Sequence, residues 1–543
     1  MNAAGLMPRA VLLLALTVLP VAIAAPTGAD ASEVEPVSFV SVTIDVDGEV
    51  LDSRFEDMDG DGRSDLVLAV RTQRDGEAAR REIRIHPMES NGSYAMVPET
   101  VVGVYDDVIL WGCGDVRDEP GRELLFMTRT GVHSYSPTLP GYKGNIRRLA
   151  TYELIYQMPD PRDLPGWRYV IEQPARDLLL LPGASGMALW GPLTGERAPD
   201  ATDDYGLIAE FGGGNGDPLF SVKAPGAVRA SAGGLKVSID TGSNKRLFLG
   251  DAPAAFAAML QADAKYRAPA IVDSNGDGRQ DLLIQRGSKL ILFEAGPDGL
   301  PTRPTRTEKL PEYLDKEDHD LVLRLHDLDA DGDTDLLAWL SEDADGIEKR
   351  VFNYFVLLND GTRMLPAEPD QVLRFKGSAT ESEVTDVDDD GRPDLVITKY
   401  ELPELTDVLT GFNFRRSAYV YFAADKQPFD RKPALRDEQS FDIESLQDAL
   451  VRRRIAADLS GDRIADLVEV DLSGRVAIRR LGEESSFFGG SDWTIEDDAW
   501  KRFEMGADVS GLEVTDLNGD GIADLVNPGE HGIWLMLSRR GDG

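Results

Sequence analysis

The sequence predicts an all-β fold built from repeated units, and three observations carry this prediction. An Asp-rich segment of about ten residues recurs six times along the 543-residue chain. Together with two degenerate copies, most recurrences are about 50–60 residues apart, a period that suits four strands and their turns better than a helical repeat. Each segment is followed by a short apolar run such as residues 66–70, which is typical of a strand. We therefore predict a β-propeller.

The six intact segments share the pattern D-x-[DNS]-x-D-G-x-x-D-L, and Arg463 alone replaces the glycine. They begin at Asp57, Asp273, Asp327, Asp386, Asp458 and Asp516. A degenerate copy begins at Asp115 and another, near residue 169, ends at Asp177. Counting both predicts eight four-stranded blades in one propeller over residues 32–543, with seven blades as the alternative if the copy ending at Asp177 is not a blade.

Each intact segment has the composition of a calcium loop. Acids or amides recur at alternate positions, so a tight turn directs them toward one ion, and the glycine permits that turn. Ligation by oxygen alone suits Ca²⁺ better than zinc or copper. The first nine positions resemble an EF-hand loop, but the bidentate glutamate expected at position twelve is not a feature of the set. Up to about six Ca²⁺ ions are expected.

The predicted ligands are positions one, three, five, seven and nine of each loop, with position seven contributing its backbone carbonyl. They are Asp57, Asp59, Asp61, Arg63 and Asp65; Asp273, Asn275, Asp277, Arg279 and Asp281; Asp327, Asp329, Asp331, Asp333 and Asp335; Asp386, Asp388, Asp390, Arg392 and Asp394; Asp458, Ser460, Asp462, Ile464 and Asp466; and Asp516, Asn518, Asp520, Ile522 and Asp524.

On these motifs the chain resembles the FG-GAP and VCBS repeat proteins, which include the propeller of integrin α subunits and many exported bacterial proteins. The resemblance spans Asp57 to Leu537. The Phe-Gly and Gly-Ala-Pro pieces of FG-GAP repeats are not clear here, so the chain is nearer to the VCBS side. The resemblance implies a β-propeller with calcium in the blade loops. It covers the six intact loops and does not extend to Asp177.

The N-terminus predicts export. Arg9 precedes an apolar run over residues 10–25 that contains Pro20, which is typical of a signal peptide and too interrupted for a membrane span. We expect a signal peptide over residues 1–31, cleaved near residue 24 or 31, no later membrane span, and a periplasmic or extracellular protein. A retained anchor is the alternative. The single cysteine, Cys113, cannot form an internal disulfide.

The two ends of the chain predict a closed ring. Only two candidate strands follow the last loop, whereas residues 37–45 are rich in β-branched side chains and alternate in polarity. We expect this segment to complete the last blade, which would remove an exposed sheet edge. A free N-terminal strand or linker is the alternative. An insertion is expected over residues 197–268, where the spacing of the loops is longest.

The charge and the motifs limit the function. A formal charge of −39 argues against nucleic acid and anionic membranes as partners. The five histidines are scattered, no nucleophile elbow or phosphate loop occurs, and no catalytic residue is assigned. Repetition of the loops suits a scaffold better than one active centre. We expect a monomeric calcium-binding scaffold for adhesion to, or binding of, a protein or carbohydrate ligand. The alternatives are a polysaccharide-active lyase or hydrolase, or a structural component of the cell envelope.

Overall fold

The computed structural model describes most of the chain from residue 37 to residue 540. The gaps in that range are residues 74–77, 142–143, 155–161, 174, 184–185, 194–202, 213–227, 232–233, 240–246, 250–269, 287, 298, 302, 317–320, 343–349, 403–413, 443–445, 486–490, 506–508 and 510. The expected signal peptide at residues 1–31 lies outside the described residues.

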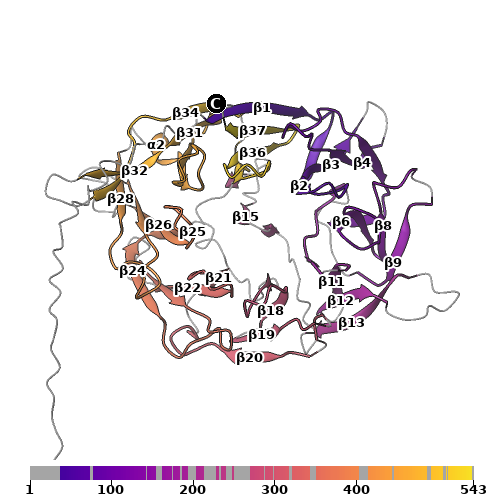
Figure 1. Ribbon diagram of the computed structural model, residues 1–543, viewed down its shortest axis with the longest axis horizontal. Coiled ribbons are helices and arrows are strands. Elements are labelled where there is room, and N and C mark those ends of the chain that lie inside the picture. The colour runs from indigo at the N-terminus through magenta and orange to yellow at the C-terminus, as the bar shows by residue number, and fades with distance from the viewer. Residues whose placement is uncertain are drawn as a thin grey trace, which may run out of the picture.

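Eight four-stranded antiparallel sheets form a ring, with the first strand of each nearest the centre (Figure 1). The fold is therefore an eight-bladed β-propeller. This confirms the predicted fold class, and the seven-bladed alternative is wrong. The copy that ends at Asp177 forms a blade of its own although its loop is degenerate. We number the blades 1 to 8 in chain order.

The strands are given blade by blade, from the centre of the ring outward. They are β2 (Glu49–Glu56), β3 (Asp65–Thr72), β4 (Arg80–His86) and β5 (Thr100–Val104) in blade 1; β6 (Val108–Gly114), β7 (Glu123–Thr128), β8 (Gly131–Tyr135) and β9 (Arg147–Thr151) in blade 2; β10 (Val170–Ile171), β11 (Leu178–Gly183), β12 (Gly186–Pro192) and β13 (Tyr205–Gly212) in blade 3; β17 (Ala270–Val272), β18 (Asp281–Arg286), β19 (Lys289–Phe293) and β20 (Arg306–Lys309) in blade 4; β21 (Leu321–His326), β22 (Asp335–Glu342), β23 (Arg350–Leu357) and β24 (Gln371–Gly377) in blade 5; β25 (Ala379–Thr385), β26 (Asp394–Glu401), β27 (Phe414–Tyr421) and β28 (Leu435–Phe441) in blade 6; β29 (Arg452–Ile455), β30 (Leu467–Val470), β31 (Arg475–Arg479) and β34 (Lys501–Glu504) in blade 7; and β35 (Glu513–Thr515), β36 (Asp524–Gly529), β37 (Gly532–Arg540) and β1 (Val37–Asp45) in blade 8.

Blade 8 is built from both ends of the chain. Strand β1 pairs antiparallel with β37 over its whole length, from Val37 opposite Arg540 to Asp45 opposite Gly532. It is the outermost strand of the blade, beside the C-terminal end in Figure 1. The backbone hydrogen bonds of this pair hold the first and last blades together, so the ring is closed without a linker.

The apolar core lies between successive blades. On β3, Leu66, Leu68 and Val70 pack in a cluster with the side chains of blade 8, whereas Val67 and Ala69 pack in a cluster with blade 2. Both faces of the strand are thus buried. A strand buried on both faces needs apolar side chains at consecutive positions, which explains why residues 66–70 form an uninterrupted apolar run.

Several elements lie outside the regular blades. A hairpin, β32 (Leu481–Ser485) and β33 (Ser491–Ile495), is inserted between β31 and β34, and Trp493 packs edge-on against Phe422 beside blade 6 with ring centroids 4.9 Å apart. A short helix, α2 (Leu446–Ala449), precedes blade 7. Strands β14 (Val228–Ser231), β15 (Gly234–Ile239) and β16 (Leu247–Leu249) form a separate sheet within the expected insertion. The first part of that range, β13, instead completes blade 3.

Candidate metal centres in the blade loops

The Asp-rich loops all occupy the same place in their blades, because each joins the first strand to the second. They therefore lie at one face of the ring, and hydrogen bonds connect consecutive loops. The bonds between backbone atoms run from Arg122 to Asp57 (3.1 Å), from Asp177 to Asp115 (2.7 Å), from Ala465 to Val387 (2.9 Å) and from Ala523 to Asp458 (2.8 Å). In blade 5 the Thr334 hydroxyl donates to the Asp273 carbonyl at 2.6 Å.

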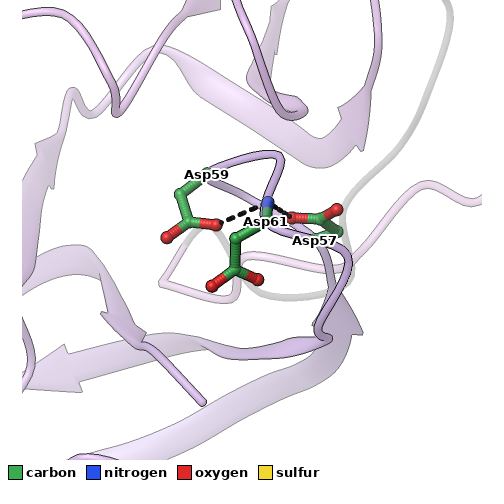
Figure 2. Close-up of side chains that lie close together, drawn as sticks. All are labelled: Asp57, Asp59 and Asp61. Carbon is green, nitrogen blue, oxygen red and sulfur yellow. Dashed lines mark hydrogen bonds between the residues drawn. The ribbon is translucent and has the colours of Figure 1, made fainter. Parts of the chain in front are cut away.

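The loop of blade 1 shows how the sequence shapes the site (Figure 2). The amide of Asp61 donates to Asp57 Oδ1 at 3.1 Å and to Asp59 Oδ1 at 3.0 Å. The amide of Gly62 donates to Asp57 Oδ2 at 2.9 Å. These are side-chain turns of the kind that aspartate favours. The bonds that bend the chain also bring the three carboxylates together.

This turn recurs in all six intact loops. In each, the amide at position six donates to Oδ2 of the aspartate at position one over 2.7–3.1 Å. Position six has a positive φ throughout, which is 84° at Gly62 and 72° at Arg463. Position four has a positive φ as well, and there Ala330 (61°) and Asp389 (57°) replace glycine. The loop geometry is thus kept even where glycine is absent.

Three loops place three carboxylates close enough to hold one metal ion. The ligand oxygens of each group lie within 4.8 Å of one another. The groups are Asp57, Asp59 and Asp61; Asp327, Asp329 and Asp335; and Asp386, Asp388 and Asp394. Nine of the predicted ligands are therefore brought together as acid triads, and oxygen-only ligation of this kind fits a hard divalent cation.

The other three intact loops carry a neutral side chain at position three, namely Asn275, Ser460 or Asn518. Within the described residues, their acids do not form a triad of this kind. The amide oxygens of Asn275 and Asn518 nevertheless accept from the position-five amides at 3.2 and 2.9 Å, as Asp59 does in blade 1. These loops keep the same turn with one charge fewer.

The acid at position nine is buried and held by the backbone. Asp65 is 2% exposed, and its two oxygens accept from the amides of Met58 at 3.1 Å and Met88 at 3.0 Å. Met88 follows β4, so this carboxylate ties the loop to the third strand of the blade. Asp335 and Asp394 make the equivalent pair of bonds at 2.7–2.8 Å. In blade 7, Asp466 accepts on Oδ2 only, and its buried Oδ1 has no hydrogen-bond partner.

Burial raises the pKa of these position-nine acids, and the other acids of the same loop raise it further. The pKa of Asp65 rises to about 6, those of Asp335 and Asp394 to about 7, and that of Asp466 to about 8. Without a cation, the position-nine carboxyl groups therefore keep their protons to a higher pH than an ordinary aspartate does.

Arginine at position seven forms an ion pair with the acid at position five in three loops. Arg63 pairs with Asp61, Arg279 pairs with Asp277, and Arg392 pairs with Asp390 at 2.7 Å. The backbone amide at position seven also donates to the same aspartate, as in Arg63 to Asp61 at 2.9 Å. From the sequence, only the backbone carbonyl of position seven was predicted to take part in the site. Recurrence of arginine two residues after the third acid was the available signal for this side-chain role.

Arginines occupy the degenerate loops of blades 2 and 3. Arg117 replaces the acid at position three, is 3% exposed, and donates to Ser134 and Asn145. Arg122 contacts three carboxylates, with nitrogen–oxygen distances of 3.3 Å to Glu56, 2.9 Å to Glu172 and 3.3 Å to Asp177. A guanidinium group thus links blades 1, 2 and 3 where the loops have lost the calcium pattern.

The fold and these loops define the class of the protein as an eight-bladed β-propeller with acidic turns at one face of the ring. A scan against protein-family models finds no match to the chain, and a search of curated proteins finds none similar to it. Among the described residues, no helix has the length and apolar character that a membrane crossing needs.

Proposed function

We propose that the protein is an exported β-propeller of the FG-GAP/VCBS type, whose blade loops bind calcium and whose ring serves as a scaffold for binding a protein or a glycan. The observation that carries this proposal is the carboxylate triad in each of the loops of blades 1, 5 and 6. It is made from positions one, three and five in blade 1 and from positions one, three and nine in blades 5 and 6. The same turn in the other three intact loops extends the expected number of sites to about six.

Calcium has a structural role in this proposal. Each loop joins the two inner strands of a blade, and hydrogen bonds join several consecutive loops, so an ion in such a loop would fix its own blade and support the neighbouring one. Acids held this close repel one another when no cation is present. Extracellular calcium modules commonly bind with dissociation constants of about 10⁻⁴–10⁻³ M, which suits an exported protein.

Export rests on the N-terminal sequence, in which an apolar run follows Arg9 and small residues precede the possible cleavage points near residues 24 and 31. Expression of the full chain in a Gram-negative host, followed by fractionation and N-terminal sequencing, tests it. A shortened chain in the periplasm or medium is the expected result. A full-length chain in the membrane fraction would show a retained anchor instead.

The scaffold role is tested with a glycan array and purified extracellular-matrix proteins, probed with the calcium-loaded protein and with the metal-free protein. We expect saturable binding to at least one ligand class that requires calcium and leaves the ligand intact. Release of shortened or unsaturated oligosaccharides would instead identify a polysaccharide-active enzyme. Failure to bind any probe in either metal state would contradict the glycan and matrix-protein roles.

A further inference from the structure

At position seven the loop of blade 5 carries Asp333, whereas the loops of blades 1, 4 and 6 carry arginine and those of blades 7 and 8 carry isoleucine. In the loops of blades 1, 4 and 6, the guanidinium group at this position pairs with the acid at position five. In blade 5 the acid at position five is Asp331, and the amide of Asp333 donates to it at 3.0 Å. Blade 5 therefore has a carboxylate at the position where three other loops have a guanidinium group.

Asp333 is buried and one of its oxygens is unused. The residue is 4% exposed, and its Oδ1 has no hydrogen-bond partner among the described residues. Two other acids, Asp331 and Asp329, act on it, and a backbone hydrogen bond from Gly361 offsets them only in part. A buried carboxylate that faces other carboxylates is unfavourable unless a proton or a cation joins it. A diffusible cation can therefore supply the positive charge that arginine supplies in the loops of blades 1, 4 and 6.

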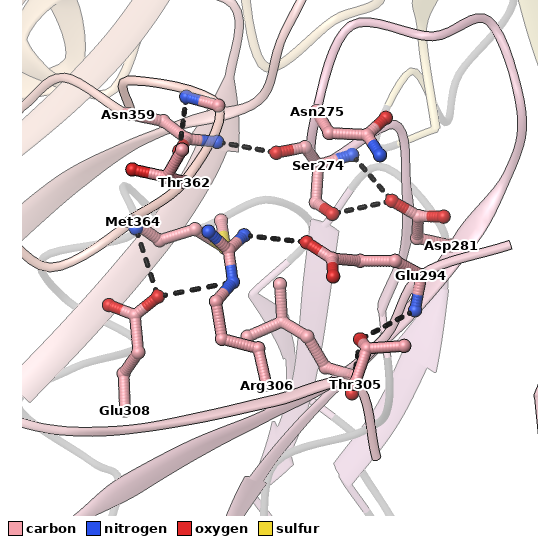
Figure 3. Close-up of polar contacts among 12 residues, drawn as sticks. Ser274, Asn275, Asp281, Glu294, Thr305, Arg306, Glu308, Asn359, Thr362 and Met364 are labelled. Carbon is pink, nitrogen blue, oxygen red and sulfur yellow. Dashed lines mark hydrogen bonds and ion pairs between the residues drawn. The ribbon is translucent and has the colours of Figure 1, made fainter. Parts of the chain in front are cut away.

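Contacts between blades 4 and 5 involve the residues next to Asp333, and Figure 3 shows one of them, between Asn359 and Ser274. The Asn359 side chain donates to the Ser274 carbonyl at 2.6 Å and to the Thr334 carbonyl at 3.1 Å. Gly276 packs against Asp333 so closely that an added Cβ would lie 3.4 Å from the Asp333 amide nitrogen. These contacts hold the two loops together beside Asp333.

We propose that Asp331 and Asp333 bind a second divalent cation, at the junction of the loops of blades 4 and 5. This ion supplies the positive charge that a guanidinium group supplies in the loops of blades 1, 4 and 6, and it is separate from the ion held by Asp327, Asp329 and Asp335. Two carboxylates completed by water suit a hard cation such as Ca²⁺ or Mg²⁺. The inference rests on the proposed function in so far as the blade loops bind calcium.

The test counts ions on the purified full chain and its variants. Each protein is equilibrated with about 1 mM free Ca²⁺, a concentration at which extracellular sites fill. Bound metal is then measured by native mass spectrometry. Asp333→Asn keeps the shape of the side chain, whereas Asp333→Arg introduces the residue that the loops of blades 1, 4 and 6 carry at this position. Asp389→Asn is the matched control, since it removes one exposed acid from a position of the blade 6 loop that is not a predicted ligand.

We expect both Asp333 variants to bind one ion fewer than the wild type, and the control to bind the same number. If Asp333→Arg does not fold, Asp333→Asn decides. Equal ion counts in the wild type and the Asp333 variants would overturn the second site while leaving the proposed calcium loops intact. Loss of more than one ion would also overturn it, because Asp333 would then support the loops as a whole. A wild type that binds no calcium would instead overturn the proposed function.

Discussion

Left-handed backbone conformations recur at positions four and six of the loops, and residues other than glycine adopt them at a cost. Ala330, Asp389 and Arg463 have φ values of 61°, 57° and 72°. A non-glycine residue pays about 1–2 kcal/mol in this region, less for aspartate, which tolerates it better. The turn bonds to the position-one aspartate hold these residues in place, so the loop overrides the preference of the individual residue.

Replacing Ala330 with glycine is expected to raise the free energy of unfolding by about 0.5–1 kcal/mol, because relief of strain exceeds the extra entropy of glycine in the unfolded chain. Denaturant unfolding of the calcium-loaded protein measures it. Gly62→Ala is the matched opposite change: its Cβ meets nothing within 4 Å, so only the φ of 84° opposes it. A loss of about 1 kcal/mol or more is expected there. Two unchanged stabilities would contradict this account of the loop.

The clustering of acids in a loop was predictable residue by residue. The alternation of acids predicted that Asp57, Asp59 and Asp61 lie together, because the same aspartates accept the hydrogen bonds that form the turn. The roles of position nine and position seven were less accessible. That Asp65 bonds to Met88, and that Arg63 turns back on Asp61, depend on strands and rotamers that a local pattern does not encode.

Arg122 connects three blades, so its replacement should weaken the contacts among blades 1, 2 and 3 and not only the loop that carries it. Replacing it with methionine would leave Glu56, Glu172 and the 2%-exposed Asp177 without their shared cation. Breaking a largely buried ion pair on one side commonly costs 3–5 kcal/mol. Because the Arg122 side chain is partly exposed, we expect a loss of about 2–3 kcal/mol.

Thermal unfolding with and without calcium measures this loss, and the same decrease is expected in both conditions because no metal takes part. Arg176→Met serves as the control, since Arg176 pairs with Asp118, whose side chain is 85% exposed. That change should cost less than about 0.5 kcal/mol. Equal effects of the two variants would contradict a bridging role for Arg122.

Strand β1 closes the ring through its pairing with β37, and its removal should therefore weaken the whole ring. A chain that begins at residue 46 is expected to melt at least about 10 °C below one that begins at residue 32. The reason is that blade 8 loses its outer strand, which is also the strand that links it to blade 1. Removal of residues 32–36 alone is the control. A melting temperature unaffected by loss of residues 37–45 would show that closure does not depend on β1.

Elements that follow the repeat were predictable, and elements inserted into it were not. The apolar run after each loop identified the second strand of a blade, since both of its faces are buried between blades. The hairpin β32–β33 was missed, because the interval from Asp458 to Asp516 that contains it has the ordinary length of a repeat. Strand β13 was placed in an insertion because no loop marks its boundary.

At the scale of the whole molecule, the raised pKa values of the position-nine acids predict the pH dependence of the metal-free protein. Asp335 and Asp394, with pKa values of about 7, bind protons in the folded state at a pH where the unfolded chain has lost them. The folded state therefore holds more protons between about pH 4 and pH 7, and stability should fall as the pH rises through that range.

Melting temperatures of the metal-free protein at pH 5 and pH 7 check this expectation. Calcium competes with protons for the same oxygens, so the difference between calcium-loaded and metal-free protein should be larger at pH 7 than at pH 5. A metal-free protein that becomes more stable from pH 5 to pH 7 would contradict the electrostatic description of the loops.

The fold as a whole follows from repetition. Eight units of similar length, each with an apolar second strand, close into a ring because every blade buries its two faces against its neighbours. The formal charge of −39 has a local explanation in part, since many of the acids gather in loops at one face. Six divalent ions would remove about 12 of these charges.

We propose that calcium occupies the blade loops and stabilises the ring. Thermal unfolding of the full chain in metal-free buffer and across a calcium titration, with bound metal counted on the same samples, tests it most directly. We expect about six ions or more, and a rise in melting temperature of about 10 °C or more at millimolar calcium, because each ion that binds only the folded state adds to stability. Fewer than about three bound ions, with a melting temperature that calcium does not change, would contradict the claim.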